Sequence, residues 1–380
     1  MARLYVFHTI TIPFHTTGEM LSRNLQDEVL FLPPFLNPTV MNRIATFFLF
    51  AAVLLVIPVG CRHKNPNNLL NPDENAVYYW RTWFNTNDYE KQFLTDHNIK
   101  TMYIRFFDVE PNDGWNEHDK CKPVATITFP FDEPVPDLNI VPVVFITPEA
   151  IVEYETFIDH LAHRIYAMCL KNSIPVKEVQ FDCDWTTSTR EAYFQFLIDV
   201  REMLKKYFGK DVAVSSTIRL HQLAQTPPAV DYGVLMCYNT GDFKDFKTRN
   251  AILDAKDVQP YLKYLNQYKL PLKLALPDYS WDVEFDGKKK FRRLNRSQNP
   301  SDVYDTTKLK CLGDGMFEII NDIPDEMVKY IRHEEVSAAT ILEVKSMVEK
   351  NYGKMPIVLY HLDSDQLSKY NHDELKEIFD

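Results

Sequence analysis

The sequence predicts an α/β protein that folds as a (β/α)8 barrel with an insertion between its seventh and eighth strands. From residue 77 onward, short apolar runs alternate with amphipathic helical segments, which is typical of a parallel sheet with crossover helices. A doubly wound open sheet is the alternative, because it uses the same alternation. The expected strands are residues 77–84, 101–108, 140–147, 178–185, 212–218, 232–239, 272–279 and 356–362.

The helical segments carry their apolar residues on one face. In residues 188–207 the apolar side chains follow the i, i+3, i+4, i+7 spacing of a helix, and residues 149–170 repeat this pattern. The stretch between the seventh and eighth strands is long and contains a basic loop at residues 287–293. We therefore expect a barrel over residues 77–380 with an insertion at about residues 282–340.

The N-terminal part of the chain carries a targeting signal. Residues 41–43 are a short basic start, residues 44–59 are apolar, and Cys61 follows a glycine. This order is typical of an export signal, and the apolar run is shorter than the ~20 residues that span a bilayer. Because the signal begins at Met41, we expect translation to start there, with residues 1–40 as an upstream extension. Residues 62–76 are polar and rich in Asn and Pro, which fits a tether.

The end of this signal resembles the bacterial lipobox, in which a cysteine after a small residue receives lipid and becomes the mature N-terminus. The resemblance implies lipidation at Cys61, attachment to a membrane through that lipid, and exposure outside the cytoplasm in a bacterial cell envelope. Pro58 stands where lipoproteins usually carry leucine. An uncleaved anchor and an ordinary secretory signal are the alternatives.

Composition and charge exclude several other classes of function. The formal net charge is −11 and the pI about 5.5, so the whole chain has no basic field that would attract nucleic acid. Only 10 of the 380 residues are glycine, and neither glycine-rich phosphate-binding motif occurs in the sequence. The five cysteines after Cys61 lack the spacing of zinc ligands. We therefore expect neither a cofactor nor a metal.

Polar side chains stand where the predicted strands end, which is where barrel enzymes carry their chemistry. At the end of the fourth strand Asp182, Asp184 and Thr186 share a face, because successive strand residues alternate. Arg219 ends the fifth strand, so we expect it to pair with an acid of the fourth. The other candidates at strand ends are Tyr238, Asn239, Asp278, Trp281 and Tyr360.

A barrel mouth rich in carboxylates, tyrosine and tryptophan suits a carbohydrate. Sugar rings stack on aromatic side chains, and sugar hydroxyls hydrogen-bond to carboxylates and amides. Glycoside hydrolysis also needs two carboxyl groups across one bond, and the candidates for that catalytic pair are Asp182, Asp184 and Asp278. The alternative is a buried Asp–Arg network that only stabilises the barrel core.

Three of these segments resemble glycoside hydrolase family 18, the chitinases and endo-N-acetylglucosaminidases. Residues 181–186 (FDCDWT) match the second half of the fourth-strand pattern Asp-Gly-x-Asp-x-Asp-x-Glu. Residues 236–239 (MCYN) match the sixth-strand pattern Met-x-Tyr-Asp except that Asn239 replaces the aspartate, and residues 359–365 (LYHLDSD) resemble the eighth-strand pattern, with tyrosine for tryptophan. The resemblance implies a TIM barrel in which Asp184 orients an N-acetyl group and Tyr238 hydrogen-bonds it.

The resemblance fails at the catalytic acid. The family's final glutamate protonates the leaving oxygen, but here that position is Thr186, which cannot deliver a proton near neutral pH. A general acid contributes about 10²–10⁴-fold in rate. The barrel then either binds an N-acetylated glycan without cleaving it, or takes its acid from another strand, with Asp278 as the best substitute. A structural envelope lipoprotein, whose barrel is only a scaffold, is the remaining alternative.

Overall fold

The computed structural model describes residues 70–380 apart from 72, 113–119, 132–134, 297–298 and 321–323. The export signal, the expected start at Met41, the lipidation site Cys61 and most of the tether lie outside the described residues and stay predictions. Within the part of the chain that the structure describes, no helix has the length and hydrophobicity needed to cross a bilayer.

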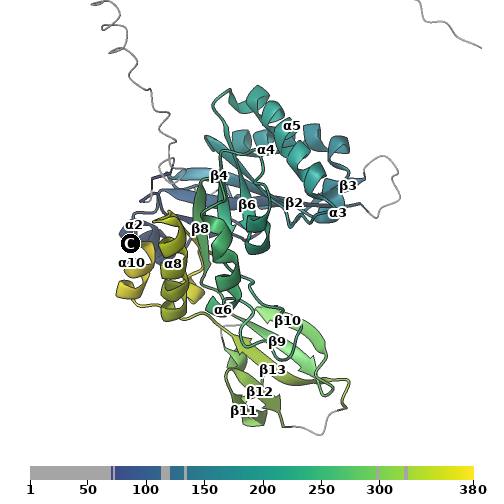
Figure 1. Ribbon diagram of the computed structural model, residues 1–380, viewed down its shortest axis with the longest axis vertical. Coiled ribbons are helices and arrows are strands. Elements are labelled where there is room, and N and C mark those ends of the chain that lie inside the picture. Colours follow the sequence, from purple (N-terminus) through teal and green to yellow (C-terminus); the bar gives the residue numbers. More distant parts are fainter. Residues whose placement is uncertain (1–69, 72, 113–119, 132–134, 297–298, 321–323) are drawn as a thin grey trace, which may run out of the picture. The chain divides into compact units, whose positions relative to one another are not determined.

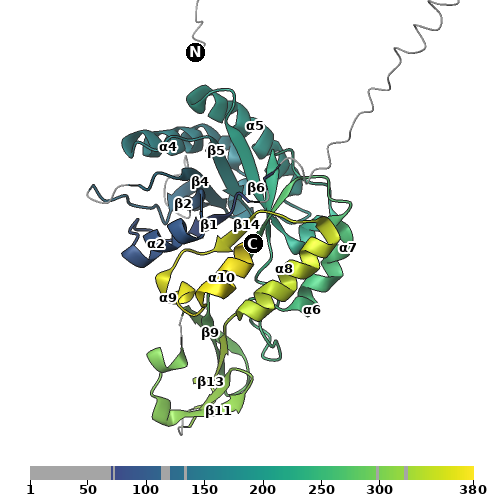
Figure 2. The same cartoon turned by 90° about the vertical axis from the view of Figure 1, so that its left-hand side faces the viewer.

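Eight parallel strands close into a barrel, which confirms the predicted fold class (Figures 1 and 2). Strand β1 pairs in parallel with both β2 and β14, and this double pairing closes the ring. An open doubly wound sheet is therefore excluded. In ring order the strands are β1 (Ala76–Tyr79), β2 (Thr101–Pro111), β4 (Asn139–Ile146), β5 (Glu178–Asp182), β6 (Ala213–Arg219), β7 (Tyr232–Met236), β8 (Leu272–Pro277) and β14 (Ile357–Tyr360).

Helices surround the strands on the outside of the barrel (Figure 2). Helix α5 (Arg190–Phe208) has the predicted apolar spacing and buries that face. The helix expected at residues 149–170 is divided into α3 (Pro148–Ile151), the 3-10 turn η2 (Tyr154–Thr156) and α4 (Ile158–Lys171). The remaining helical elements are α2 (Asp88–Asp96), η3 (Leu220–Ala224), α6 (Ala255–Val258), η4 (Gln259–Tyr261), α7 (Leu262–Leu265), α8 (Ala338–Tyr352), α9 (Ser364–Leu367) and α10 (His372–Phe379).

One side of the barrel departs from the regular alternation. Between β2 and β4 the described residues contain no helix, and β3 (Cys121–Val124) instead pairs antiparallel with the end of β2. The sequence predicts this extra strand at residues 124–129. It lies earlier in the chain, because its partner is the part of β2 that extends to Pro111.

The barrel interior is polar at the amino-terminal end of its strands. Glu178 accepts hydrogen bonds from Ser215 (2.5 Å) and Tyr232, and the Tyr232 hydroxyl contacts that of Tyr103, which accepts from Lys273 (3.0 Å). Burial raises the pKa of Glu178 and lowers the pKa of Lys273, and the opposite charge of each opposes the shift of the other. Because these buried polar groups are satisfied by one another, the network stabilises this end of the barrel.

The insertion between β8 and β14 forms a five-stranded antiparallel sheet in the order β10-β9-β13-β12-β11. The basic loop at residues 287–293 is its first hairpin, where Lys288 pairs with Glu326 and Arg293 pairs with Glu284. These two basic side chains of the loop are therefore ion-paired with carboxylates of the same insertion. The elements are β9 (Trp281–Asp286), β10 (Phe291–Arg296), η5 (Pro300–Asp302), η6 (Thr306–Lys308), β11 (Leu309–Gly313), β12 (Met316–Ile319) and β13 (Val328–Glu334).

Candidate functional site

The barrel mouth lies at the carboxyl ends of the strands, and side chains from several strands meet there. Asp182 ends β5, the fourth strand of the ring, and Arg219 ends β6. Tyr238 lies two residues after the end of β7 and belongs to the core inside the barrel, and Tyr360, which ends β14, packs against that core. The period-two alternation therefore brings side chains from four of the predicted strand ends to one place.

One arginine binds both aspartates of the fourth strand. The Arg219 guanidinium donates to Asp182 Oδ1 through Nη2 (3.1 Å) and to Asp184 Oδ1 through Nε. Thr217 donates another hydrogen bond, of 2.5 Å, to Asp182 Oδ1. The side chain of Asp182 is 6% exposed and that of Asp184 is 52% exposed, so this arrangement runs from the barrel interior to solvent. We call these three charged residues the Arg219 clamp.

The clamp fixes the charges at the mouth. Burial raises the pKa of Asp182, while the Arg219 guanidinium and the Thr217 hydroxyl act in the opposite direction. Burial alone would lower the pKa of Arg219, but the carboxylates of Asp182 and Asp184 outweigh it and raise that pKa. Arg219 is therefore cationic at any physiological pH, and both aspartates are committed to it.

Four aromatic rings form an aromatic wall beside the clamp. Tyr238 stacks on Tyr360, with ring centroids 5.0 Å apart and an interplanar angle of 30°. Tyr279 meets Tyr238 edge-on at 6.2 Å and contacts Trp281 at 5.4 Å. Stacked and edge-to-face contacts of this kind stabilise aromatic clusters. The wall is therefore held together by its own rings.

Trp281 is also fixed by the inserted sheet. Its Nε1 donates to Glu334 Oε2 (2.7 Å), and Arg332 Nε donates to the other oxygen of that carboxylate (2.6 Å). Trp281 begins β9 and lies opposite Glu334 of β13 and opposite Arg296 of β10. The register of three inserted strands thus brings one ring and one cation to the barrel mouth, and the insertion contributes directly to the site.

Two hollows flank Tyr238 and Asn239, which line both of them. The larger, of about 380 Å³, also contains the rest of the aromatic wall, and the smaller, of about 290 Å³, contains Asp184 and Arg219. Asn239 has φ = 53°, a left-handed conformation that asparagine adopts more readily than most residues. Tyr279 donates a 2.6 Å hydrogen bond to Asn239 Oδ1. The amide of Asn239 is therefore held between the two hollows.

Asp278, which we expected at the mouth beside Asp184, is not among the residues that line the two hollows. It shares a strand face with Leu274 and Leu276, which pack in the core that includes the barrel helices, and it lines neither hollow. Burial raises the pKa of Asp278 well above its ordinary value, and the side-chain charges that act on it are those of Asp363 and Lys369.

Sequence reasoning missed several residues of the larger hollow. Burial lowers the pKa of His361 to about 4, so this ring is neutral at neutral pH. His361 and Asp363 lie inside the segment that resembles the eighth-strand pattern, and that resemblance could have indicated them. No pattern in the sequence indicates Arg296, because only the pairing register of β10 with β9 brings it to the mouth. In the described part of the chain, no group of three His, Cys, Asp or Glu side chains is placed to hold a metal ion.

The closed ring of parallel strands is a (β/α)8 barrel, and aromatic side chains line a hollow at its mouth. The structure is similar to the Bacillus cereus spore cortex-lytic enzyme SleL, at 17% identity over 81% of this chain and 74% of that chain, with a TM-score of 0.47. It is also similar to the C-terminal domain of a putative chitinase from Desulfitobacterium hafniense DCB-2 (9% identity, 80% and 99% coverage, TM-score 0.49). A third similar structure is a glycoside hydrolase family 18 N-acetylglucosaminidase from Paenibacillus barengoltzii (11% identity, 80% and 98% coverage, TM-score 0.44). No family model and no curated protein matches the chain.

Proposed function

We propose that this chain is a carbohydrate-binding barrel that holds an N-acetylated glycan at its mouth and does not hydrolyse it. The observation that carries this proposal is the Arg219 clamp on Asp182 and Asp184. The clamp engages the two carboxylates that a hydrolytic mechanism at this mouth would use. The aromatic wall beside it still borders a hollow that a ligand can enter.

The larger hollow has the features of a sugar-binding site. Its volume of about 380 Å³ lies within the usual range for small-molecule sites. The rings of Tyr279 and Trp281 offer apolar surface for the face of a sugar, and Asn239, Arg296 and Asp363 offer polar groups for its hydroxyls and acetamide. An N-acetylated sugar has both kinds of surface, and the resemblance of residues 181–186 and 236–239 to family 18 favours that class.

Hydrolysis requires a carboxyl that holds a proton and can deliver it to the scissile bond. Thr186 occupies the position of the family's acid and hydrogen-bonds to the Ser188 hydroxyl (2.8 Å). Asp182 and Asp278 both have a raised pKa, but neither lines a hollow of the mouth. Neither of these candidate acids therefore reaches a sugar bound against the aromatic wall.

We also propose that Cys61 carries the lipid that attaches this barrel to a bacterial membrane, with residues 62–76 as the tether. The support is the order of the sequence, with a basic start, an apolar run and a cysteine after glycine. A tethered barrel of this kind would hold a glycan of the cell envelope close to the membrane.

Calorimetric titration of the full chain with chitotetraose tests the binding proposal. Trp281→Ala should weaken the affinity by about tenfold or more, as expected for an aromatic anchor. Tyr89→Ala is the matched control, because Tyr89 is an exposed ring on α2 that lines neither hollow, and it should leave the affinity unchanged. Cellotetraose, which lacks the acetamide groups, should bind more weakly. If neither sugar binds, the proposal fails and a scaffold role is favoured.

A further inference from the structure

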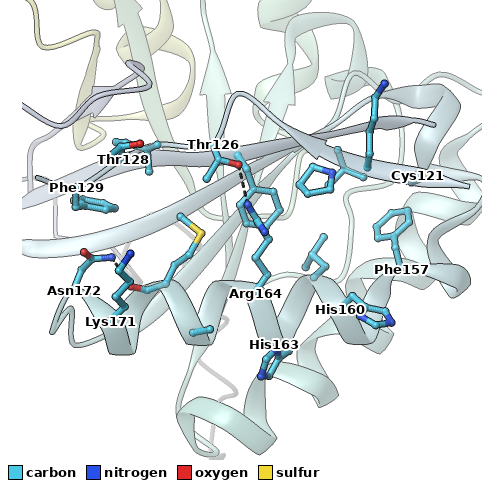
Figure 3. A pocket seen from close by; sticks show the side chains of 18 of the residues that line it. Cys121, Thr126, Thr128, Phe129, Phe157, His160, His163, Arg164, Lys171 and Asn172 are labelled. Carbon is cyan, nitrogen blue, oxygen red and sulfur yellow. Dashed lines mark hydrogen bonds between the residues drawn. The ribbon is translucent and has the colours of Figure 1, made fainter. Parts of the chain in front are cut away.

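We propose that a groove on the outside of the barrel binds a single-chain anionic amphiphile, of which a long-chain carboxylate is the simplest form. The groove has a volume of about 670 Å³ and lies between α4 and residues 120–129 (Figure 3). None of its lining residues lines either hollow of the mouth. We call it the lateral groove, and it is a separate site from the proposed sugar site.

The lateral groove lies on the side of the barrel where the described residues between β2 and β4 contain no helix. In a regular (β/α)8 barrel, each strand is followed by a helix of the outer ring. Helix α5 packs against α4 on one flank. One stripe of α4, which contains Ile158, Ala162, Ile165 and Cys169, is buried in the core. A neighbouring stripe lines the groove and contains Leu161, Arg164, Ala167, Met168 and Lys171 (Figure 3).

The groove has an apolar floor of elongated shape. Phe107 of β2 and Ile127, in the segment between β3 and β4, are buried, and Phe129 and Met168 are partly buried beside them. The lining follows α4 from Phe157 to Lys171, which corresponds to a length of about 21 Å at 1.5 Å per helical residue. An apolar surface of this length matches a linear hydrocarbon chain.

The charges of the groove select an anion. Among the described residues, the lining contains the cations Lys120, Lys122, Arg164 and Lys171 and no aspartate or glutamate, although the chain as a whole has a net charge of −11. Lys120 already pairs with Glu153 outside the lining (2.7 Å). The lining therefore has cationic side chains for a negatively charged head group and no carboxylate that would repel it.

Arg164 is the residue best placed to receive that head group. Its guanidinium lies over the Phe107 ring, 5.1 Å from the centroid, and donates to Thr126 Oγ1 (3.0 Å). An anionic oxygen that pairs with this guanidinium would be stabilised by a charge-assisted hydrogen bond.

The size of the groove fits a small amphiphile. Its volume of about 670 Å³ lies within the usual range for small-molecule sites. In a single-chain amphiphile, the hydrocarbon chain can pack on the apolar floor while the anionic head group pairs with a cationic side chain of the lining.

The test compares two amphiphiles of equal chain length, dodecanoate and dodecyltrimethylammonium, by calorimetry on the full chain below their micelle concentrations. Dodecanoate should bind at least about tenfold more tightly, since it alone can pair with Arg164. Arg164→Gln should weaken dodecanoate binding by about tenfold, and Arg164→Lys should restore most of it. Ala167→Glu places an acid at an exposed position of the lining and should abolish binding without disturbing the core.

Arg190→Gln is the matched control, since Arg190 lies outside the lateral groove and pairs with Glu191, and it should leave dodecanoate binding unchanged. The melting temperature of every variant should be measured alongside, so that loss of fold is not counted as loss of binding. Equal affinity for the two amphiphiles, or unchanged affinity in Arg164→Gln, would overturn the proposal. Binding of an acidic amphipathic peptide without binding of dodecanoate would overturn it as well.

Discussion

The Arg219 guanidinium donates its Nε–H to the carboxylate of Asp184, so the ends of two neighbouring barrel strands are joined by an ion pair at the mouth. The same guanidinium binds Asp182 in the barrel interior. A sugar entering the smaller hollow therefore meets an ion-paired surface with fixed donors and acceptors. This ion-paired surface is the basis of our proposal that the mouth binds a glycan without hydrolysing it.

Arg219→Gln should lower the free energy of unfolding by about 3 kcal/mol, because it leaves the buried carboxylate of Asp182 without its cation. Urea denaturation measures this loss, and Asp182→Asn in the same background should recover part of it. Arg190→Gln, which breaks an exposed pair, should cost less than about 1 kcal/mol. Equal losses in the two arginine variants would show that the clamp has no structural role.

Asp278→Asn should stabilise the protein at neutral pH. Burial raises the pKa of Asp278, so the folded state holds this proton more tightly than the unfolded chain. The stability of the wild type therefore falls as the pH rises from about 4, the ordinary pKa of aspartate, toward the raised folded value. Unfolding measured against pH should show the two proteins close together below pH ~4 and diverging above it. A difference that does not change with pH would argue against a buried, protonated Asp278.

His361→Gln should reduce the loss of stability in mild acid. The pKa of His361 is lowered by burial to about 4, whereas the unfolded side chain titrates near its ordinary value of about 6.5. The stability contributed by the neutral folded ring is complete above pH ~6.5 and is lost as the pH falls toward about 4, by up to about 3 kcal/mol. Subtracting the variant's unfolding profile from that of the wild type should give a slope confined to this window. A flat difference would contradict the buried, neutral ring.

Cys61→Ser should release the protein from membranes. In the proposed lipoprotein the thiol of Cys61 is the attachment point, so a hydroxyl in its place removes the lipid and the anchor. Expression from Met41 in a bacterial host, followed by membrane fractionation and mass spectrometry, measures both effects. Cys121→Ser is the control, since it removes a thiol of the barrel and should leave the protein membrane-bound. An equally membrane-bound Cys61→Ser protein of unchanged lipid mass would rule out the lipoprotein proposal.

Alternation of apolar and polar residues is enough to predict the barrel and part of the mouth. The expected strand at residues 178–185 and the observed strand β5 both begin at Glu178. The alternation of side chains along neighbouring strands predicts that Arg219 pairs with an acid of this strand, and it does pair with Asp182. Asp278 follows β8 and is not among the residues that line the two hollows, so a position after a strand end does not by itself place a residue in a hollow of the mouth.

Other parts of the structure depend on pairings that no local pattern reveals. Arg296 reaches the mouth only because β10 lies opposite β9 in a particular register, and Glu334 fixes Trp281 through the pairing of β13 with β9. The lateral groove depends on how Arg164 of α4 lies against Thr126, which is far from it in sequence. Long-range register of this kind is decided by the packing of the whole domain and not by the periodicity of any one segment.

The most direct test of binding without hydrolysis is to measure both in one mixture of the full chain and chitotetraose. Calorimetry gives the affinity, and a reducing-sugar assay on the same sample after prolonged incubation gives any cleavage. We expect saturable binding and no reducing ends above those of a protein-free control. Release of reducing ends by the wild type, lost in Asp184→Asn or Asp278→Asn, would contradict the central claim and assign the mouth to catalysis.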